Sequence, residues 1–250
     1  MIQLVEKDEN TTRTYVQQLK QRCDEKDRKV DAIVADILEN VRNNGDKAVA
    51  EYTLKFDGSI PEQVEITKEQ MKELTKQCDA YFLEALERAA KNIHEFHSRQ
   101  KQQSWLDTKD NGVILGQRVR GLAKVGIYVP GGTAAYPSSV LMNAIPAKIA
   151  GVQEIVMVTP PGKDGKPNPD IMAAALVAGV DRVFLVGGAQ AVAALAYGTE
   201  TMPKVDKIVG PGNIFVATAK KHLYGTVDID MIAGPSEILI VADETANPKY

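Results

Sequence analysis

The chain has 250 residues, 44% of them hydrophobic and 25% charged, with a formal net charge of −3, which accommodates one large domain or two smaller ones. This charge excludes a chain-wide basic surface for nucleic acid, and the absence of an uncharged apolar run of about 18 residues argues against a membrane span. Cys23 and Cys78 cannot form a disulfide framework and no secretory signal opens the chain, so we expect a cytoplasmic protein.

The first hundred residues are charged and are expected to be mainly helical. In residues 27–43 the apolar side chains recur with the period of a helix, and Gly45 supplies a stop. A shorter helix is expected to follow and to end before the turn at Phe56-Asp57-Gly58. The pattern predicts two helices separated at the glycine.

Three further elements are expected before residue 121. Thr67, followed by Gln70, has the pattern of a helix start, and residues 79–99 carry one apolar helical face. Residues 98–104 are polar and are expected to be a solvated connection. Residues 112–120 roughly alternate between apolar and polar side chains, which predicts a half-exposed strand.

From Leu122 the chain becomes less charged and richer in Ala, Val, Ile and Gly, which marks the expected domain boundary. Short apolar strands then alternate four times with helices of roughly ten residues, which predicts βαβ crossovers and a parallel sheet covered on both faces. We therefore expect an α/β fold with a Rossmann-like domain, although Gly210-Pro-Gly212 lacks the third glycine of the dinucleotide fingerprint. The expected strands are residues 127–129, 154–159, 182–186 and 207–209.

Capping residues set the expected limits of the helices. Ser138 or Ser139 is expected to cap the first helix of the repeats, and Pro146 to kink it or end it early. Asn168 and Pro169 are expected to open the second helix, which Gly179 closes. A last pair of strands is expected at residues 227–230 and 238–241.

Four loops lie where the parallel strands end, which is the edge at which open α/β sheets bind ligands. Tyr128 precedes the first loop, Gln190 follows the third and Asn213 closes the fourth, and these side chains can hydrogen-bond ribose, phosphate or carboxamide. Each also has a structural interpretation, since Gln190 and Asn213 stand at helix starts and Tyr128 at a strand end. Ser236, in the turn at residues 234–237, either holds a polar substrate or stabilises that turn.

The histidines and cysteines do not form a catalytic site by pattern alone. His94 and His97 stand three apart on an expected helix without a third ligand nearby, which indicates a solvated face. His222 lies at a Lys-rich helix end, where a cation interacts favourably with the dipole. Cys23 and Cys78 have no activating neighbour. We therefore predict no catalytic acid–base pair and no complete metal site in this chain.

Five stretches resemble the histidinol dehydrogenase family, in its order and spacing. The resemblance extends from about residue 43 to Asp243. It implies oxidation of L-histidinol to L-histidine through an aldehyde, in two successive NAD-dependent steps of histidine biosynthesis. The stretches are residues 125–133, 136–142, 186–200, 205–213 and 233–239.

The resemblance also implies roles for individual residues. Tyr128, Gln190 and Asn213 match NAD-contacting positions of the family, and Ser236 matches a substrate contact. The family forms an intertwined homodimer of two Rossmann-like domains with smaller appendages, an aldehyde-dehydrogenase-like architecture, and a zinc ion holds the substrate.

This architecture implies three parts of the chain. Residues 1–121 are a helical N-terminal region with part of a first α/β domain, and residues 122–233 are a Rossmann-like NAD-contacting domain. Residues 234–250 are a strand returning into the first domain, which we expect to be truncated.

In the family, the zinc ligands and the Glu-His pair used for proton transfer come after the position of Tyr250. We therefore expect no catalytic residue and no zinc ligand in this chain, and no activity by the chain alone. One alternative is a non-catalytic nucleotide-binding or subunit-interaction module. Another is a different enzyme of aldehyde-dehydrogenase-like arrangement, which needs a reactive cysteine at a loop.

Overall fold

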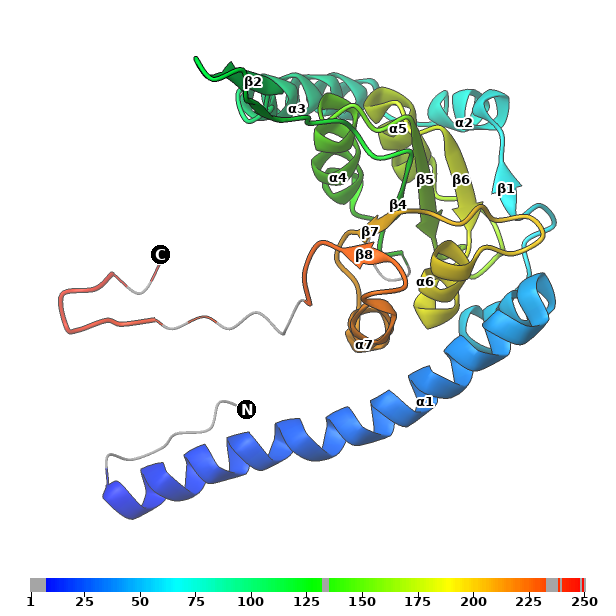
Figure 1. Ribbon diagram of the computed structural model, residues 1–250. Helices are drawn as coiled ribbons and strands as arrows, with labels where there is room; N and C mark the ends of the chain where they lie inside the picture. Colours follow the sequence, from blue (N-terminus) through cyan, green and yellow to red (C-terminus); the bar gives the residue numbers. More distant parts are fainter. Residues whose placement is uncertain (1–7, 132–134, 233–237, 239, 248, 250) are drawn as a thin grey trace.

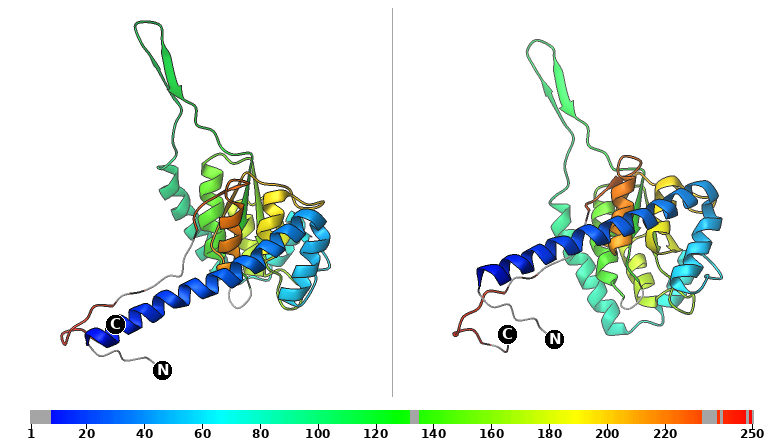
Figure 2. Two further views of the ribbon diagram at one scale, coloured as in Figure 1. Left: turned by 60° about the horizontal axis from the view of Figure 1, so that its bottom comes forward. Right: turned by 90° about the horizontal axis from the view of Figure 1, so that it is seen from below.

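The computed structural model describes residues 8–131, 135–232, 238, 240–247 and 249. A six-stranded sheet is covered by helices (Figure 1), and a separate two-stranded hairpin stands apart from it (Figure 2). In chain order the elements are α1 (Glu9–Asp57), β1 (Glu65–Ile66), α2 (Lys68–Thr75), α3 (Ala80–Ser98), β2 (Trp105–Thr108), β3 (Ile114–Gln117), β4 (Lys124–Tyr128), α4 (Pro137–Ile149), β5 (Glu154–Thr159), α5 (Pro169–Ala178), β6 (Arg182–Leu185), α6 (Gly188–Tyr197), β7 (Lys207–Val209), α7 (Ile214–Leu223) and β8 (Asp228–Ile229).

The sheet has the strand order β1-β6-β5-β4-β7-β8. Strands β4 to β8 are mutually parallel, and β1 joins the β6 edge in the antiparallel direction. Without β1, the order numbered along the chain is 3-2-1-4-5, which is the order of a Rossmann sheet. The predicted α/β class with a mainly parallel sheet is confirmed. The order reverses between β4 and β7, which places the topological switch point there.

Alternation along the strands sends side chains into two separate cores. In β4, Ile127 belongs to the core under α2, α3, α4 and α5, whereas Tyr128 belongs to the core under α1, α6 and α7. Met157 and Val158 of β5 divide in the same way. The helices that follow β4 and β5 therefore cover one face, and those that follow β6 and β7 cover the other (Figure 1).

Helix α1 joins the two helices expected on either side of Gly45. This glycine has non-helical angles, φ 51° and ψ −132°, so the helix is kinked where the stop was predicted. The Asp46 N–H that follows donates to the Glu200 carboxylate at 2.9 Å. The first half of α1 extends beyond the sheet in all three views (Figures 1 and 2). Within the described ranges, no helix combines the length and the apolar character needed to cross a bilayer.

The predicted caps of α2 and α5 are confirmed, but that of α4 is wrong. Asn168 accepts from the backbone of the first turn of α5, and Gly179 ends that helix with φ 73°. Helix α4 instead begins at Pro137, because a proline loses no hydrogen bond at the first helical position. The helix also continues through Pro146 to Ile149. Burial of one face of α4 compensates for the lost backbone bond; the buried residues are Val140, Leu141, Ala144 and Ile145.

The hairpin of β2 and β3 corrects the expectation for residues 112–120. Every residue of both strands is exposed, so the strand predicted to be half-exposed buries neither face. The hairpin projects away from the body of the molecule (Figure 2). The partner strand at Trp105–Thr108 was not predicted, because its sequence does not alternate.

The strand expected at residues 238–241 is absent from the residues of this segment that the structure describes. Ile238, Ile240 and Val241 have no strand structure and are 88%, 81% and 87% exposed. Leu239 lies outside the described residues. Apolar side chains with this exposure contact no sheet, so the pattern alone does not form a strand here.

Candidate functional site

The loops after β4, β5 and β6 meet at the carboxyl edge of the sheet. Pro160, directly after β5, lies between two glycines of the neighbouring loops. A Cβ atom on Gly131 would lie 3.1 Å from the Pro160 ring, and one on Gly187 would lie 2.6 Å from it. Side chains at these glycines would therefore separate the loops, which explains why glycine occupies both positions.

Tyr128 connects the end of β4 to the start of α6. Its side chain is 3% exposed, and its hydroxyl accepts a hydrogen bond from the Gly188 N–H at 3.0 Å. No side chain caps α6 at Gly187, so the phenol satisfies one of the free N–H groups of the first turn. Burial raises the pKa of Tyr128 to about 12, against the lowering effect of the Gly188 bond, and the charge of Asp57 also raises it. The phenol therefore stays protonated near neutral pH.

Gln190 lies in the first turn of α6 and is completely buried. Neither its Oε1 nor its Nε2 has a hydrogen-bond partner in the described part of the chain. The amide folds back onto Gly188, where a Cβ would lie 2.5 Å from Oε1 and where φ is +65°. An unpaired buried amide costs about 1–3 kcal/mol, and such groups concentrate at functional sites.

Asn213 caps α7, which is the helix-start role that the sequence allowed for it beside a ligand contact. Its Oδ1 accepts from the N–H groups of Phe215 and Val216 at 3.0 and 3.1 Å, and the residue is exposed. The loop that carries it lies against β4, since a Cβ on Gly210 would be 2.2 Å from the Tyr128 carbonyl oxygen.

The structure therefore brings Tyr128 and Gln190 together at Gly188 and places the Asn213 loop beside Tyr128 at the switch point. Their roles in binding stay predictions. Ser236 lies outside the described residues.

Sequence reasoning missed Lys220 and Asp230, which hold the loop after β7. Lys220 belongs to the Lys-rich helix end noted around His222, and it is 3% exposed. Its ammonium group donates to the Gly210 carbonyl at 3.0 Å and contacts the Asp230 carboxylate. Asp230 Oδ2 also accepts the Gly210 N–H at 2.8 Å. Both polar groups of the Gly210 backbone are thus fixed, which orients the loop that leads to α7.

The histidines take structural positions. His94 is exposed, and His97 interacts with the Gln100 side chain. His222 pairs with Asp31 at 2.9 Å and connects α7 to α1.

The described thiol, Cys78, is not activated. Burial, with a contribution from Asp170, raises its pKa to about 11, which is the opposite of activation. Over the described ranges, no three His, Cys, Asp or Glu side chains are gathered so as to hold a metal ion.

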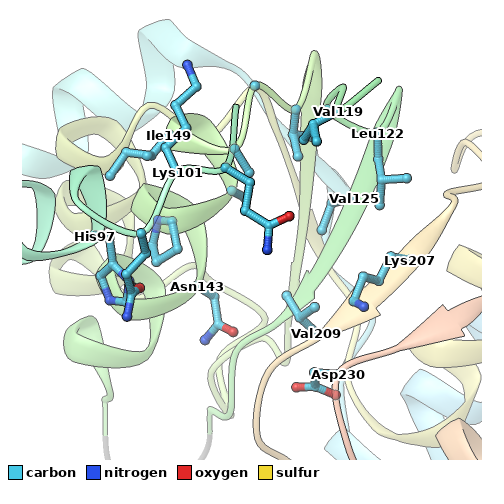
Figure 3. A pocket seen from close by; sticks show the side chains of 18 of the residues that line it. His97, Lys101, Val119, Leu122, Val125, Asn143, Ile149, Lys207, Val209 and Asp230 are labelled. Carbon is cyan, nitrogen blue, oxygen red and sulfur yellow. The ribbon is translucent and has the colours of Figure 1, made fainter. Parts of the chain in front are cut away.

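A groove of about 730 Å³ lies on the face of the sheet that α4 covers, opposite the face covered by α6 and α7 (Figure 3). Val125 and Val209 form part of its wall, from neighbouring strands β4 and β7, and Asn143 of α4 borders it. Lys207 and Asp230 add charged groups. Tyr128, Gln190 and Asn213 do not line this groove, and Asp230, which also fixes the Gly210 loop, is the residue that it shares with the loop cluster.

We predict that Lys220→Met destabilises the fold by about 3 kcal/mol, because it leaves the partly buried Asp230 carboxylate without its cation. Urea unfolding measures this difference. The exposed Lys221→Met serves as the control on the same helix and should have little effect. Adding Asp230→Asn to Lys220→Met should restore part of the loss. A Lys220→Met variant as stable as Lys221→Met would contradict the assigned network.

Comparisons with known proteins agree with this fold. The family model for histidinol dehydrogenase matches residues 20–250. The chain is 60% identical to the histidinol dehydrogenase of Clostridium acetobutylicum over 236 residues, which are 94% of this chain and 55% of that protein. It is 59% identical to that of Listeria innocua over 214 residues, 86% of this chain and 50% of that protein.

A crystal structure of histidinol dehydrogenase from Elizabethkingia anophelis superposes with a TM-score of 0.80 at 39% identity, covering 87% of this chain and 51% of that one. The chain spans about half the length of the curated relatives it matches. It belongs to the histidinol dehydrogenase family.

Proposed function

We propose that the chain forms the NAD-contacting part of a histidinol dehydrogenase, which oxidises L-histidinol to L-histidine through the aldehyde with two NAD in histidine biosynthesis. The relatives that carry this name support the proposal, as does a sheet with the strand order of dinucleotide-binding domains. We assign NAD contact to residues 122–233, within an aldehyde-dehydrogenase-like architecture in the cytoplasm. Residues 1–121 and 234–250 then belong to a first α/β domain.

The observation that carries the proposal is the unpaired amide of Gln190 at the start of α6. Both of its polar atoms are buried beside Gly188, next to the Tyr128 hydroxyl. Turning the side chain outward breaks no hydrogen bond in the described part of the chain, so the amide can reach a ligand at little polar cost.

The described residues at this edge fit a nucleotide. Gln190 and Asn213 offer amides, Tyr128 offers a protonated phenol, and the N-termini of α6 and α7 favour the negative charge of a pyrophosphate. When bound, NAD accepts the hydride that leaves the substrate carbon. The chain's own residues bind and orient the nucleotide, and Ser236 is proposed to contact the substrate.

The described residues do not fit a zinc ion, because they gather no set of three ligands. Among the described residues we assign no general base for the substrate hydroxyl, since the carboxyl whose charge reaches Tyr128, that of Asp57, is assigned to nucleotide binding below. The chain alone is therefore proposed to bind NAD without turning over histidinol.

We predict that this chain, mixed with L-histidinol, NAD and zinc, produces no NADH, because hydride transfer needs a general base near the substrate hydroxyl. Absorbance at the NADH band measures the product. A histidinol dehydrogenase relative assayed in the same buffer serves as the positive control. Histidinol-dependent NADH formation by the chain would refute its proposed inactivity.

We predict that Gln190→Leu weakens NAD binding about tenfold, the loss expected for one good hydrogen-bonding group. Isothermal titration calorimetry measures the dissociation constant. Because leucine removes two unpaired polar atoms from a buried position, the urea midpoint should stay the same or rise.

The matched control is Gln153→Leu, an exposed glutamine just before β5 at the opposite edge of the sheet. It should bind NAD like the unaltered chain. The proposed NAD site would be wrong if the unaltered chain bound no NAD, or if the two variants bound it equally well.

We further propose that the chain assembles as a homodimer, which the exposed hairpin supports. Leu106 and Ile114 of the hairpin are 80% and 64% exposed, and exposed apolar groups on a projecting element are typical of a protein contact. An interaction module is the second candidate function, and this hairpin favours it.

We predict a dimer mass in light scattering for the unaltered chain and a shift toward monomer for Leu106→Glu, since a buried carboxylate disfavours the contact. Tyr81→Glu on α3, where the tyrosine is 73% exposed, is the control and should remain dimeric. A monomer mass for the unaltered chain would contradict the assembly.

A further inference from the structure

Asp57 occupies a position that disfavours a carboxylate in the free protein. It is the last residue of α1, and Gly58 follows it in the left-handed conformation. The C-terminus of a helix carries partial negative charge and repels an acidic side chain. The Oδ2 atom is closed off from solvent and has no hydrogen-bond partner in the described part of the chain, and burial raises the pKa of this carboxyl. A buried polar atom without a partner calls for an explanation, and a ligand that completes it is one such explanation.

The surroundings of Asp57 belong to the loop cluster at the carboxyl edge. Two residues further on, the Ser59 hydroxyl donates to the Gly162 carbonyl of the loop after β5 at 3.4 Å. The charge of Asp57 acts on the Tyr128 phenol, and that phenol meets Gly188, onto which the unpaired Gln190 amide folds. The Asp57 carboxyl, whose Oδ2 lacks a partner, and the unpartnered Gln190 amide therefore both belong to the surroundings of this loop cluster.

An acidic residue has a defined use at this edge of a dinucleotide-binding sheet. In such folds a carboxylate accepts hydrogen bonds from the adenosine ribose hydroxyls of NAD. It usually follows the second strand of the domain, which here is β5. Strand β5 ends at Thr159 and continues into Pro160 and Pro161, so no acidic residue stands directly at that strand end. The acid further along this loop, Asp164, is exposed and accepts the Lys166 N–H.

We propose that Asp57, supplied by α1 from outside the βαβ units, accepts the adenosine ribose hydroxyls and selects NAD over NADP. The inference rests on the proposed NAD function of the loop cluster. Two vicinal hydroxyls donate to one carboxylate and give its oxygens the partners that the free protein lacks. The 2′-phosphate of NADP removes one of these donors and adds negative charge beside the carboxylate, which is repulsive.

The loop after β5 also contains two lysines, whose charges could favour NADP over NAD. Lys163 and Lys166 are exposed, and a lysine there could attract the 2′-phosphate of NADP. The proposal holds that the carboxylate of Asp57 outweighs them, and measuring both nucleotides decides between these effects.

The test measures the dissociation constants of NAD and NADP by calorimetry for the unaltered chain, Asp57→Asn and Glu51→Gln. Glu51 is an exposed acid on the same helix, and its variant controls for the loss of one negative charge. We expect the unaltered chain and Glu51→Gln to prefer NAD by about tenfold or more. In Asp57→Asn, NAD should bind about tenfold more weakly, and the preference should fall to about threefold or less.

Urea unfolding of the same proteins separates a ligand role from a structural one. Asparagine relieves an unpaired buried charge, so the midpoint of Asp57→Asn should equal or exceed that of the unaltered chain. A lower midpoint with unchanged nucleotide preference would overturn the proposal in favour of a structural role. Equal binding of NAD and NADP by the unaltered chain would overturn the proposed role of Asp57 but leave the proposed NAD function intact. No NAD binding at all would overturn both.

Discussion

The hydrogen bond from the Gly188 N–H to the Tyr128 hydroxyl is the contact on which the candidate site depends. It joins the end of β4 to the start of α6, which follows β6, so it spans the loop after the intervening strand β5. Pro160 fills the space between these loops against Gly131 and Gly187. Three loops that are distant in the sequence are thereby held at one edge of the sheet.

The fourth loop is fixed to the same edge by different chemistry. Gly210 lies against the Tyr128 carbonyl, and the buried ammonium group of Lys220 and the carboxylate of Asp230 bind the two polar groups of the Gly210 backbone. These groups are satisfied and rigid, whereas Gln190 and Asp57 nearby have polar atoms without partners in the described part of the chain. A rigid frame around unsatisfied polar atoms is the arrangement expected of a preorganised binding site.

Local chemistry explains which parts of the fold were predictable from the sequence. Residues 154–159 form a strand at their expected bounds, because a strand buried on both faces appears as a short apolar run. Residues 207–209 also form a strand at their expected bounds, with only Ile208 fully buried. The cap at Asn168 follows from its own side chain and the proline after it.

Contacts between distant residues explain most of what was missed. Lys220 resembles any helix-end lysine until Asp230 and Gly210 fold around it. Asp57 resembles an ordinary turn residue until the turn after α1 meets the loop after β5 through Ser59 and Gly162. The β2 strand gave no periodic signal, since all of its residues are exposed and neither of its faces is selected by a core.

The central claim is that the nucleotide binds at the loop cluster of Tyr128 and Gln190 and not in the groove on the opposite face of the sheet. Titration of the isotope-labelled chain with NAD, followed through backbone amide chemical shifts, locates the site directly. We predict shifts at Gly188, Gln190 and Asn213, with the amides of Asn143 and Val209 unchanged. Shifts confined to Asn143 and Val209, or no shift at any of the loop residues, would contradict the claim.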